Sequence, residues 1–147
     1  MNKILIALVL AVVMSSNAYA KDKLYYICID GNGEETWTID KSKESAYRYY
    51  IYKTGRISDD AYELRFYEYV IQIGKEYHER ISGIKKFRPV YKLDRRTLEL
   101  KSIADYSDDR ARVDTKFCKV SEELETIEFR KIISTARKLE YEKSLKF

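Results

Sequence analysis

Short runs of alternating apolar and polar residues, separated by tight-turn sequences, constrain the fold of this chain more than any other feature. Tyrosine supplies many of the larger side chains in these runs, and 13 of the 14 tyrosines follow residue 20. Tyrosine beside Ile, Val, Thr and Phe favours a pleated, half-buried surface. Alternation and turn residues predict strands at 24–29, 36–39, 46–52, 62–66, 69–73, 77–81, 87–93, 97–103 and 112–120. We therefore expect a mainly β (α+β) fold, an antiparallel meander of about seven to nine strands that curls into a small barrel or a sandwich.

Residues 121–147 follow a different period. Ser121 is a residue type that caps helices, and the acidic residues after it suit the positive end of a helix dipole. Apolar residues then recur at helical spacing, at Phe129, Ile132, Ile133, Ala136 and Leu139. We expect one amphipathic helix over 121–147 that docks this stripe on the β domain of residues 21–120. The alternative is that the stripe grips a partner or a membrane surface.

The first 20 residues have the three parts of a secretory signal peptide. Asn2 and Lys3 precede an apolar run at positions 4–14, and the segment ends in Ala18, Tyr19 and Ala20. Small side chains at the first and third positions before the cut are those that signal peptidase accepts. The run is shorter than the about 20 residues that span a bilayer, and no later apolar stretch reaches that length. We predict cleavage between Ala20 and Lys21 and a periplasmic or secreted protein with no transmembrane segment after cleavage; an uncleaved anchor is the alternative.

The two cysteines, Cys28 and Cys118, both lie in the predicted mature chain, whose length suits one domain. An exported protein meets an oxidising compartment, where an even and small number of cysteines favours a disulfide. The bond would join the first predicted strand to the last. Two buried thiols or a metal site are the alternatives, and a metal site would have to rely on His78 as its one histidine.

Sequence spacings that carry catalysis or bind metals are missing. A single histidine excludes a pair of histidine ligands on one helix, and no Gly-x-Ser-x-Gly elbow occurs. The acidic stretches 30–34 and 105–109 lack the glycine and the glutamate that a calcium loop needs at its sixth and twelfth positions. We therefore expect no enzymatic activity, no metal and no cofactor.

Basic residues are concentrated in residues 80–101, where eight Lys and Arg residues accompany only two acidic ones. In a regular strand Lys86, Arg88 and Lys92 would share one face, while residues 87, 89, 91 and 93 would point into the core. Such a face could bind the phosphates of lipopolysaccharide, of anionic lipid or of nucleic acid. An ordinary solvated sheet face is the alternative.

A few features are similar to those of the periplasmic inhibitors of C-type lysozyme. These are the signal peptide, the Tyr26-Ile27-Cys28 sequence, the expected small barrel and one disulfide. The resemblance implies an inhibitory loop that enters the lysozyme cleft, and Ser82-Gly83 matches its Ser-Gly sequence. The chain departs from that family because Lys85, Lys86 and Phe87 stand where a tyrosine is expected, and because of its long C-terminal helix.

The residues favour two functions. The first is a non-enzymatic, exported binding module whose partner could be a polyanion or a protein. The second is a periplasmic inhibitor of a cell-wall hydrolase that uses the Ser82-Gly83 loop.

Overall fold

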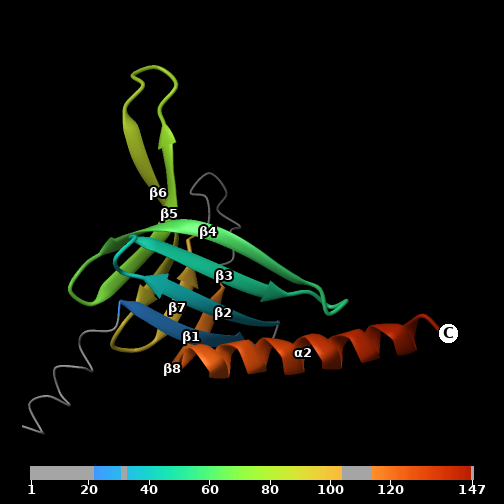
Figure 1. The fold of residues 1–147 in the computed structure, drawn as a ribbon. Helices are drawn as coiled ribbons and strands as arrows, with labels where there is room; N and C mark the ends of the chain where they lie inside the picture. The colour runs from blue at the N-terminus through green and yellow to red at the C-terminus, as the bar shows by residue number, and fades with distance from the viewer. Residues whose placement is uncertain (1–21, 31–32, 104–113, 147) are drawn as a thin grey trace, which may run out of the picture.

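A computed structural model describes residues 22–30, 33–103 and 114–146, and within them eight antiparallel strands form a closed barrel (Figure 1). Each strand pairs with the next along the chain, and β8 pairs with β1. The strands are β1 (Lys23–Asp30), β2 (Gly33–Asp40), β3 (Ser45–Ile51), β4 (Ile57–Phe66), β5 (Val70–His78), β6 (Lys85–Asp94), β7 (Glu99–Ser102) and β8 (Thr115–Ser121). The helix α2 (Glu123–Ser144) follows β8 directly. The predicted mainly β meander with one C-terminal helix is confirmed, in its barrel form.

Several predicted strand limits need correction. β4 begins at Ile57 instead of residue 62, because residues 57–61 already pair with β3. Residues 77–81 do not form a strand of their own; β5 runs to His78, and Ile81 lies in the turn that follows. The predicted cleavage site, Ala20 and Lys21, and the acidic stretch 105–109 lie outside the described residues. So do residues 112 and 113 of the last predicted strand.

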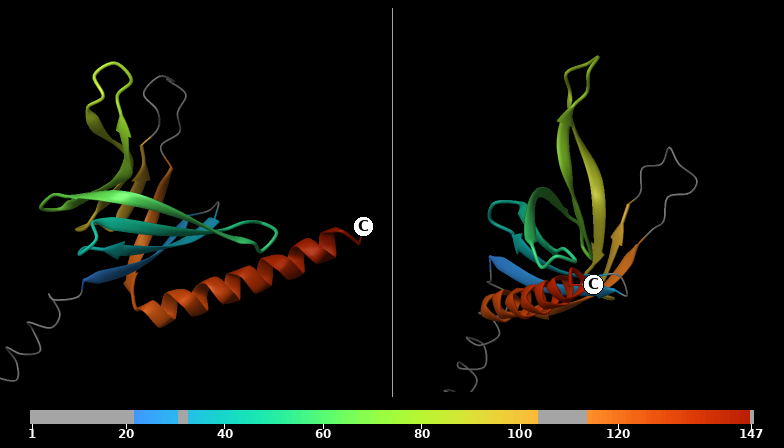
Figure 2. Two further views of the ribbon diagram at one scale, coloured as in Figure 1. Left: turned by 45° about the horizontal axis from the view of Figure 1, so that its top comes forward. Right: turned by 90° about the vertical axis from the view of Figure 1, so that its right-hand side faces the viewer.

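The barrel interior is filled by branched and aromatic side chains from alternate positions. Trp37 and Ile39 of β2 are buried beside Ala46 of β3 and Ile71 and Ile73 of β5. β2 is also buried on its outer face, where Thr36 has no exposed surface. This strand is covered on both sides because α2 lies along the outside of β1, β2 and β3 (Figures 1 and 2).

The helix α2 is held by polar contacts more than by its predicted apolar stripe. Arg130 Nη1 donates to Thr36 Oγ1 at 2.8 Å, Ser134 Oγ donates to the Gly55 carbonyl at 2.5 Å, and Arg137 bonds Glu34. The stripe prediction is wrong for Ile132 and Leu139, which are 67% and 54% exposed, and for Ala136, which is also exposed. Their side chains lie away from the docked face, which is centred on Thr126, Arg130 and Arg137 instead.

The beginning of α2 also differs from the prediction. Ser121 does not cap the helix, because it is the last residue of β8 and pairs with Tyr25 of β1. The N-cap residue is Glu122, which makes no side-chain capping hydrogen bond. Within the described residues, no helix is both long enough and apolar enough to cross a lipid bilayer.

The β1–β8 seam that closes the barrel carries the disulfide. Cys28 and Cys118 are opposed in the register of these strands, with their Cα atoms 4.0 Å apart, and their sulfurs are bonded. Both side chains are buried. The predicted pairing is therefore found, and it ties the first strand of the barrel to the last.

The β5–β6 hairpin leaves the barrel and stands out from it (Figures 1 and 2). The pairing register shifts at its base, between Ile73 and Gly74, which leaves one extra residue in β6. The two strands approach so closely there that a Cβ atom on Gly74 would lie 2.1 Å from the Arg88 carbonyl oxygen. A bulge of this kind bends a hairpin and increases its twist. We call residues 75–88 the hairpin arm.

Candidate functional site

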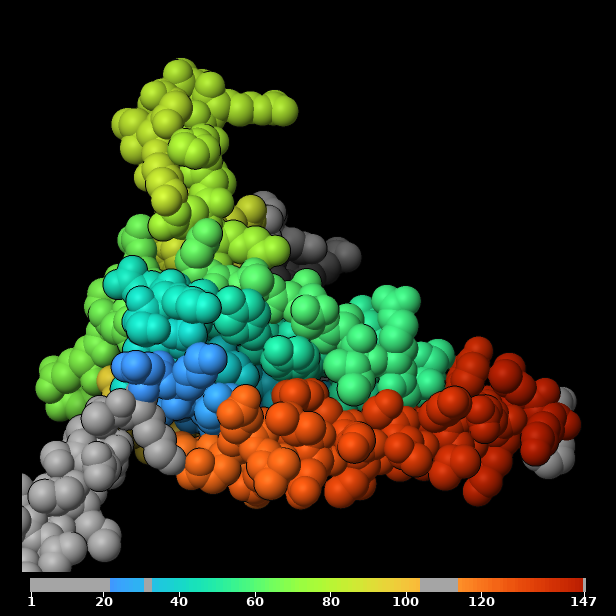
Figure 3. All heavy atoms as spheres, in the orientation of Figure 1, coloured from blue at the N-terminus to red at the C-terminus, as the bar shows by residue number. Residues whose placement is uncertain are grey.

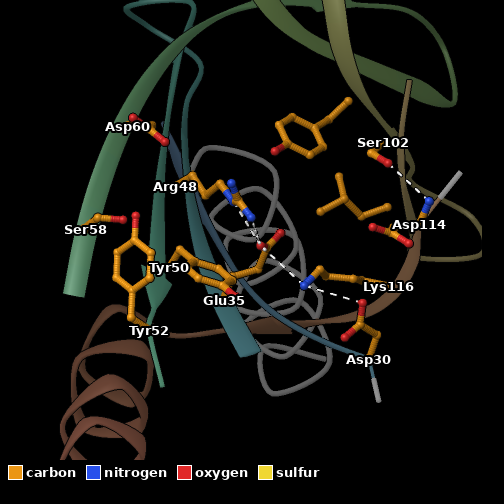
Figure 4. A pocket seen from close by; sticks show the side chains of 12 residues that line it. Asp30, Glu35, Arg48, Tyr50, Tyr52, Ser58, Asp60, Ser102, Asp114 and Lys116 are labelled. Atoms are coloured by element: carbon orange, nitrogen blue, oxygen red, sulfur yellow. Dashed lines mark hydrogen bonds and ion pairs between the residues drawn. The ribbon is translucent and has the colours of Figure 1, made fainter. Parts of the chain in front are cut away.

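A polar pocket of about 360 Å³ opens inside the barrel, lined by 12 residues from or beside every strand except β5 (Figure 4). Its volume lies within the range of small-molecule sites. One wall comes from β3 and β4, with Tyr50, Tyr52, Ser58 and Asp60. The opposite wall comes from β7, from β8 and from the residue before β8, with Ser102, Lys116 and Asp114.

The floor of the pocket is a charged cluster of Asp30, Glu35, Arg48 and Lys116. The Glu35 side chain has no exposed surface, and its Oε2 accepts hydrogen bonds from Arg48 Nη2 at 2.6 Å and Nε at 2.9 Å. Lys116 Nζ lies 3.6 Å from the same oxygen and 3.5 Å from Asp30 Oδ2. A carboxylate this deeply buried is tolerated only when it is paired and hydrogen-bonded. The two cations therefore supply the partners that Glu35 needs at the base of the pocket.

Aromatic rings fix the charged cluster from the side. Trp37 Nε1 donates to Glu35 Oε1 at 2.8 Å, and the Trp37 ring packs edge-on against Tyr91 with the ring centres 5.1 Å apart. The Arg48 guanidinium lies 5.0 Å from the centre of the Tyr50 ring and 5.4 Å from that of Tyr91. Cation–π contacts and hydrogen bonds together leave Arg48 little freedom to move. The site is thus organised before any ligand arrives.

Burial raises the pKa of Tyr91 to about 12, against an ordinary value of 10.0, and the nearby Arg48 charge lowers it only in part. Because the unfolded chain loses this proton first, Tyr91 should make the barrel less stable as the pH rises from 10.0 toward about 12. A spectrophotometric titration of tyrosinate checks this. The difference between wild type and Tyr91→Phe should titrate near the upper value, and a difference that titrates near the ordinary value would contradict it.

The mouth of the pocket carries more negative than positive charge. Four carboxylates line the site, and two of them, Asp30 and Glu35, face the two cations of the charged cluster. Asp60 and Asp114 supply the excess, and both are exposed on opposite walls (Figure 4). The pocket is therefore acidic at its opening although the whole chain has a net charge of +4. This arrangement suits a ligand with a protonated amine and with hydroxyl groups that tyrosine and serine can bond.

No known protein family, curated protein or solved structure matches this chain. The chemistry of the pocket is therefore the basis for a function. Among the described residues, no three His, Cys, Asp or Glu side chains gather as metal ligands.

The predicted anion-binding residues Lys86, Arg88 and Lys92 are all exposed on β6, but the bulge divides them. Lys86 and Arg88 belong to the hairpin arm, opposite Tyr77 and Lys75, whereas Lys92 lies in the barrel wall opposite Gln72. Lys86 Nζ also pairs with Glu79 Oε1 at 2.9 Å. A count of basic residues along 80–101 omits Glu79, which lies just before that segment. Anion binding by the three residues stays a prediction.

The expectation that residues 87, 89, 91 and 93 face the core holds fully only for Leu93, which is buried. Phe87 cannot reach the barrel interior because it lies on the hairpin arm, where its ring packs under the Arg65 guanidinium at 4.5 Å. Ser82 and Gly83 lie at the tip of the arm, where Gly83 adopts a φ of +66° and a Cβ built on it would meet no atom within 4 Å beyond its chain neighbours. An inhibitory role for this pair remains a prediction.

Sequence reasoning missed the charged cluster, although a signal for it was present. Glu35 lies on the same face of β2 as Trp37 and Ile39. Arg48 lies on the same face of β3 as Ala46 and Tyr50. A charged residue in phase with core residues on each of two paired strands indicates a buried ion pair. Lys116 carried a weaker signal, because Cys118 is the one buried residue that shares its face of β8.

Proposed function

We propose that this chain is an exported, non-enzymatic binding module that holds a small amine-bearing ligand in the barrel pocket. The single observation that carries the proposal is the excess of carboxylates at the mouth, above a floor whose charges already satisfy one another. Asp60 and Asp114 face a protonated amine from two sides, and Tyr50 and Tyr52 offer ring faces and hydroxyls. The predicted signal peptide and the Cys28–Cys118 disulfide support export to an oxidising compartment.

The polarity of the lining argues against a fatty ligand. Among the lining residues only Leu100 is aliphatic. A hydrocarbon tail would displace water from the charged cluster and could not replace the hydrogen bonds that this water makes. A neutral sugar could stack on the tyrosines but would bring no positive charge to Asp60 and Asp114. A compact cation with hydroxyl groups uses both features.

Trp37 provides the readout, because it is the one tryptophan of the chain and it bonds Glu35 beneath the pocket. Glucosamine and spermidine are the test probes, with glucose and glucuronate as neutral and anionic comparisons. We expect both amines to change Trp37 fluorescence in a saturable way. Replacing Asp60 and Asp114 together with asparagine should weaken binding by about tenfold or more, which corresponds to about 1.4 kcal/mol.

Asp59→Asn is the matched control. Asp59 is the exposed neighbour of Asp60 in β4 and does not line the pocket, so its loss removes the same charge at another place. Binding to this variant should equal binding to wild type. The proposal fails if neither amine binds, if glucuronate binds better, or if the Asp60 and Asp114 double variant binds the amines unchanged.

A further inference from the structure

The hairpin arm projects from the body of the barrel, and its tip stands clear of the other strands (Figure 3). Ile81 is 98% exposed and Ile84 is 60% exposed, on either side of Ser82 and Gly83. At these exposures, no element of the described part of the chain covers either side chain. Exposed apolar side chains that gather in one patch rimmed by polar residues mark interaction sites.

Positive charge surrounds this apolar tip. The hairpin arm contains five basic residues, Lys75, Arg80, Lys85, Lys86 and Arg88, against two acidic ones, Glu76 and Glu79, which gives a net charge of +3 with His78 neutral. Lys85 pairs with Glu76 and Lys86 with Glu79 across the two strands. Both acidic residues of the arm are therefore paired with lysines, which reduces their repulsion of an anionic surface.

The arm is held in one shape. Ser82 Oγ donates to Glu79 Oε2 at 2.6 Å, and the Glu79 amide donates to the Ile84 carbonyl at 3.0 Å. His78 Nδ1 lies 3.3 Å from the Gly83 carbonyl oxygen. The bulge in β6, opposite Ile73 and Gly74, sets the direction in which the arm leaves the barrel. A preformed tip pays little ordering entropy when it binds.

We propose that the tip of the hairpin arm docks this protein on an anionic lipid surface. Ile81 and Ile84 enter the boundary between headgroups and acyl chains, the basic residues bond the lipid phosphates, and the half-exposed Tyr77 lies at the level where aromatic rings are favoured. The narrow tip favours a bilayer over a protein partner. A stable protein interface buries about 1,200–2,000 Å², far more than the end of a two-stranded hairpin offers.

Vesicle co-sedimentation tests the proposal with the chain that begins at Lys21, which contains the whole barrel and α2. We expect binding to vesicles of phosphatidylcholine with phosphatidylglycerol, weak or no binding to phosphatidylcholine alone, and a steep loss as salt rises. Replacing Ile81 and Ile84 together with serine should weaken binding by about tenfold or more. In an Ile81→Trp variant, brominated lipid should quench the fluorescence of the added tryptophan, measured after subtraction of the Trp37 signal.

Ile132→Ser is the matched control, because Ile132 is also highly exposed but lies on α2. Its binding to vesicles should equal that of wild type. The proposal is overturned if anionic vesicles do not bind even at low salt, or if the Ile81 and Ile84 double variant binds as well as wild type. It is also overturned if wild type inhibits a C-type lysozyme but does not bind vesicles, and the Ile81 and Ile84 double variant no longer inhibits that enzyme. None of these outcomes depends on amine binding in the pocket.

Discussion

Replacing Glu35 with alanine is expected to lower the free energy of unfolding by about 3–5 kcal/mol, because it leaves Arg48 and Lys116 facing each other without their shared carboxylate. Their side chains are only 19% and 14% exposed, so water can replace little of what Glu35 provides. Trp37 also loses its hydrogen-bond acceptor. Urea unfolding followed by far-ultraviolet circular dichroism measures the change.

Two further variants separate charge from shape. Glu35→Gln retains an acceptor for Trp37 but removes the charge, and it should lose most of the same stability. Glu99→Ala breaks the surface pair with Lys101, whose atoms are 3.6 Å apart and exposed, and it should cost no more than about 1 kcal/mol. A Glu35→Ala loss as small as that of Glu99→Ala would contradict the role given to the charged cluster.

Removing the disulfide should have the second large effect. Replacing Cys28 and Cys118 with alanine frees a loop of 90 positions in the unfolded chain, and the expected loss is about 2–5 kcal/mol. The loss falls on the β1–β8 seam, where only the backbone pairing from Tyr25 to Ile29 then closes the barrel. Thermal or urea unfolding of the oxidised wild type and the double variant gives the difference.

Reductant supplies the internal control for this prediction. It should destabilise wild type to about the level of the double variant and leave the double variant unchanged. Alkylation of both thiols in the folded protein before any reductant is added would show that the bond does not form in the native compartment.

The β-strands could be predicted because their signals act between neighbours in the chain. The disulfide could be predicted because the chain has only two cysteines. Alternation within 24–29 and 36–39 reports burial on one face, and two cysteines in an exported chain allow only one pairing. The α2 helix was visible for the same reason, through its period. Its docked face was not, because Arg130 and Arg137 bond Thr36 and Glu34, which precede them by 94 and 103 positions.

Local conformation could be read from the sequence in most segments, because alternation, turn residues and helical spacing act between neighbours in the chain. The sequence also limited chemistry, with one histidine and two cysteines. That Glu35, Arg48 and Lys116 meet in one pocket follows from the pairing of β2 with β3 and from the closure of the barrel by β8. The bulge in β6 opposite Gly74, which turns the hairpin arm and Ile81 away from the core, also appears only in the folded structure. Each of these depends on strand pairing and barrel closure, which bring together residues that no local pattern relates.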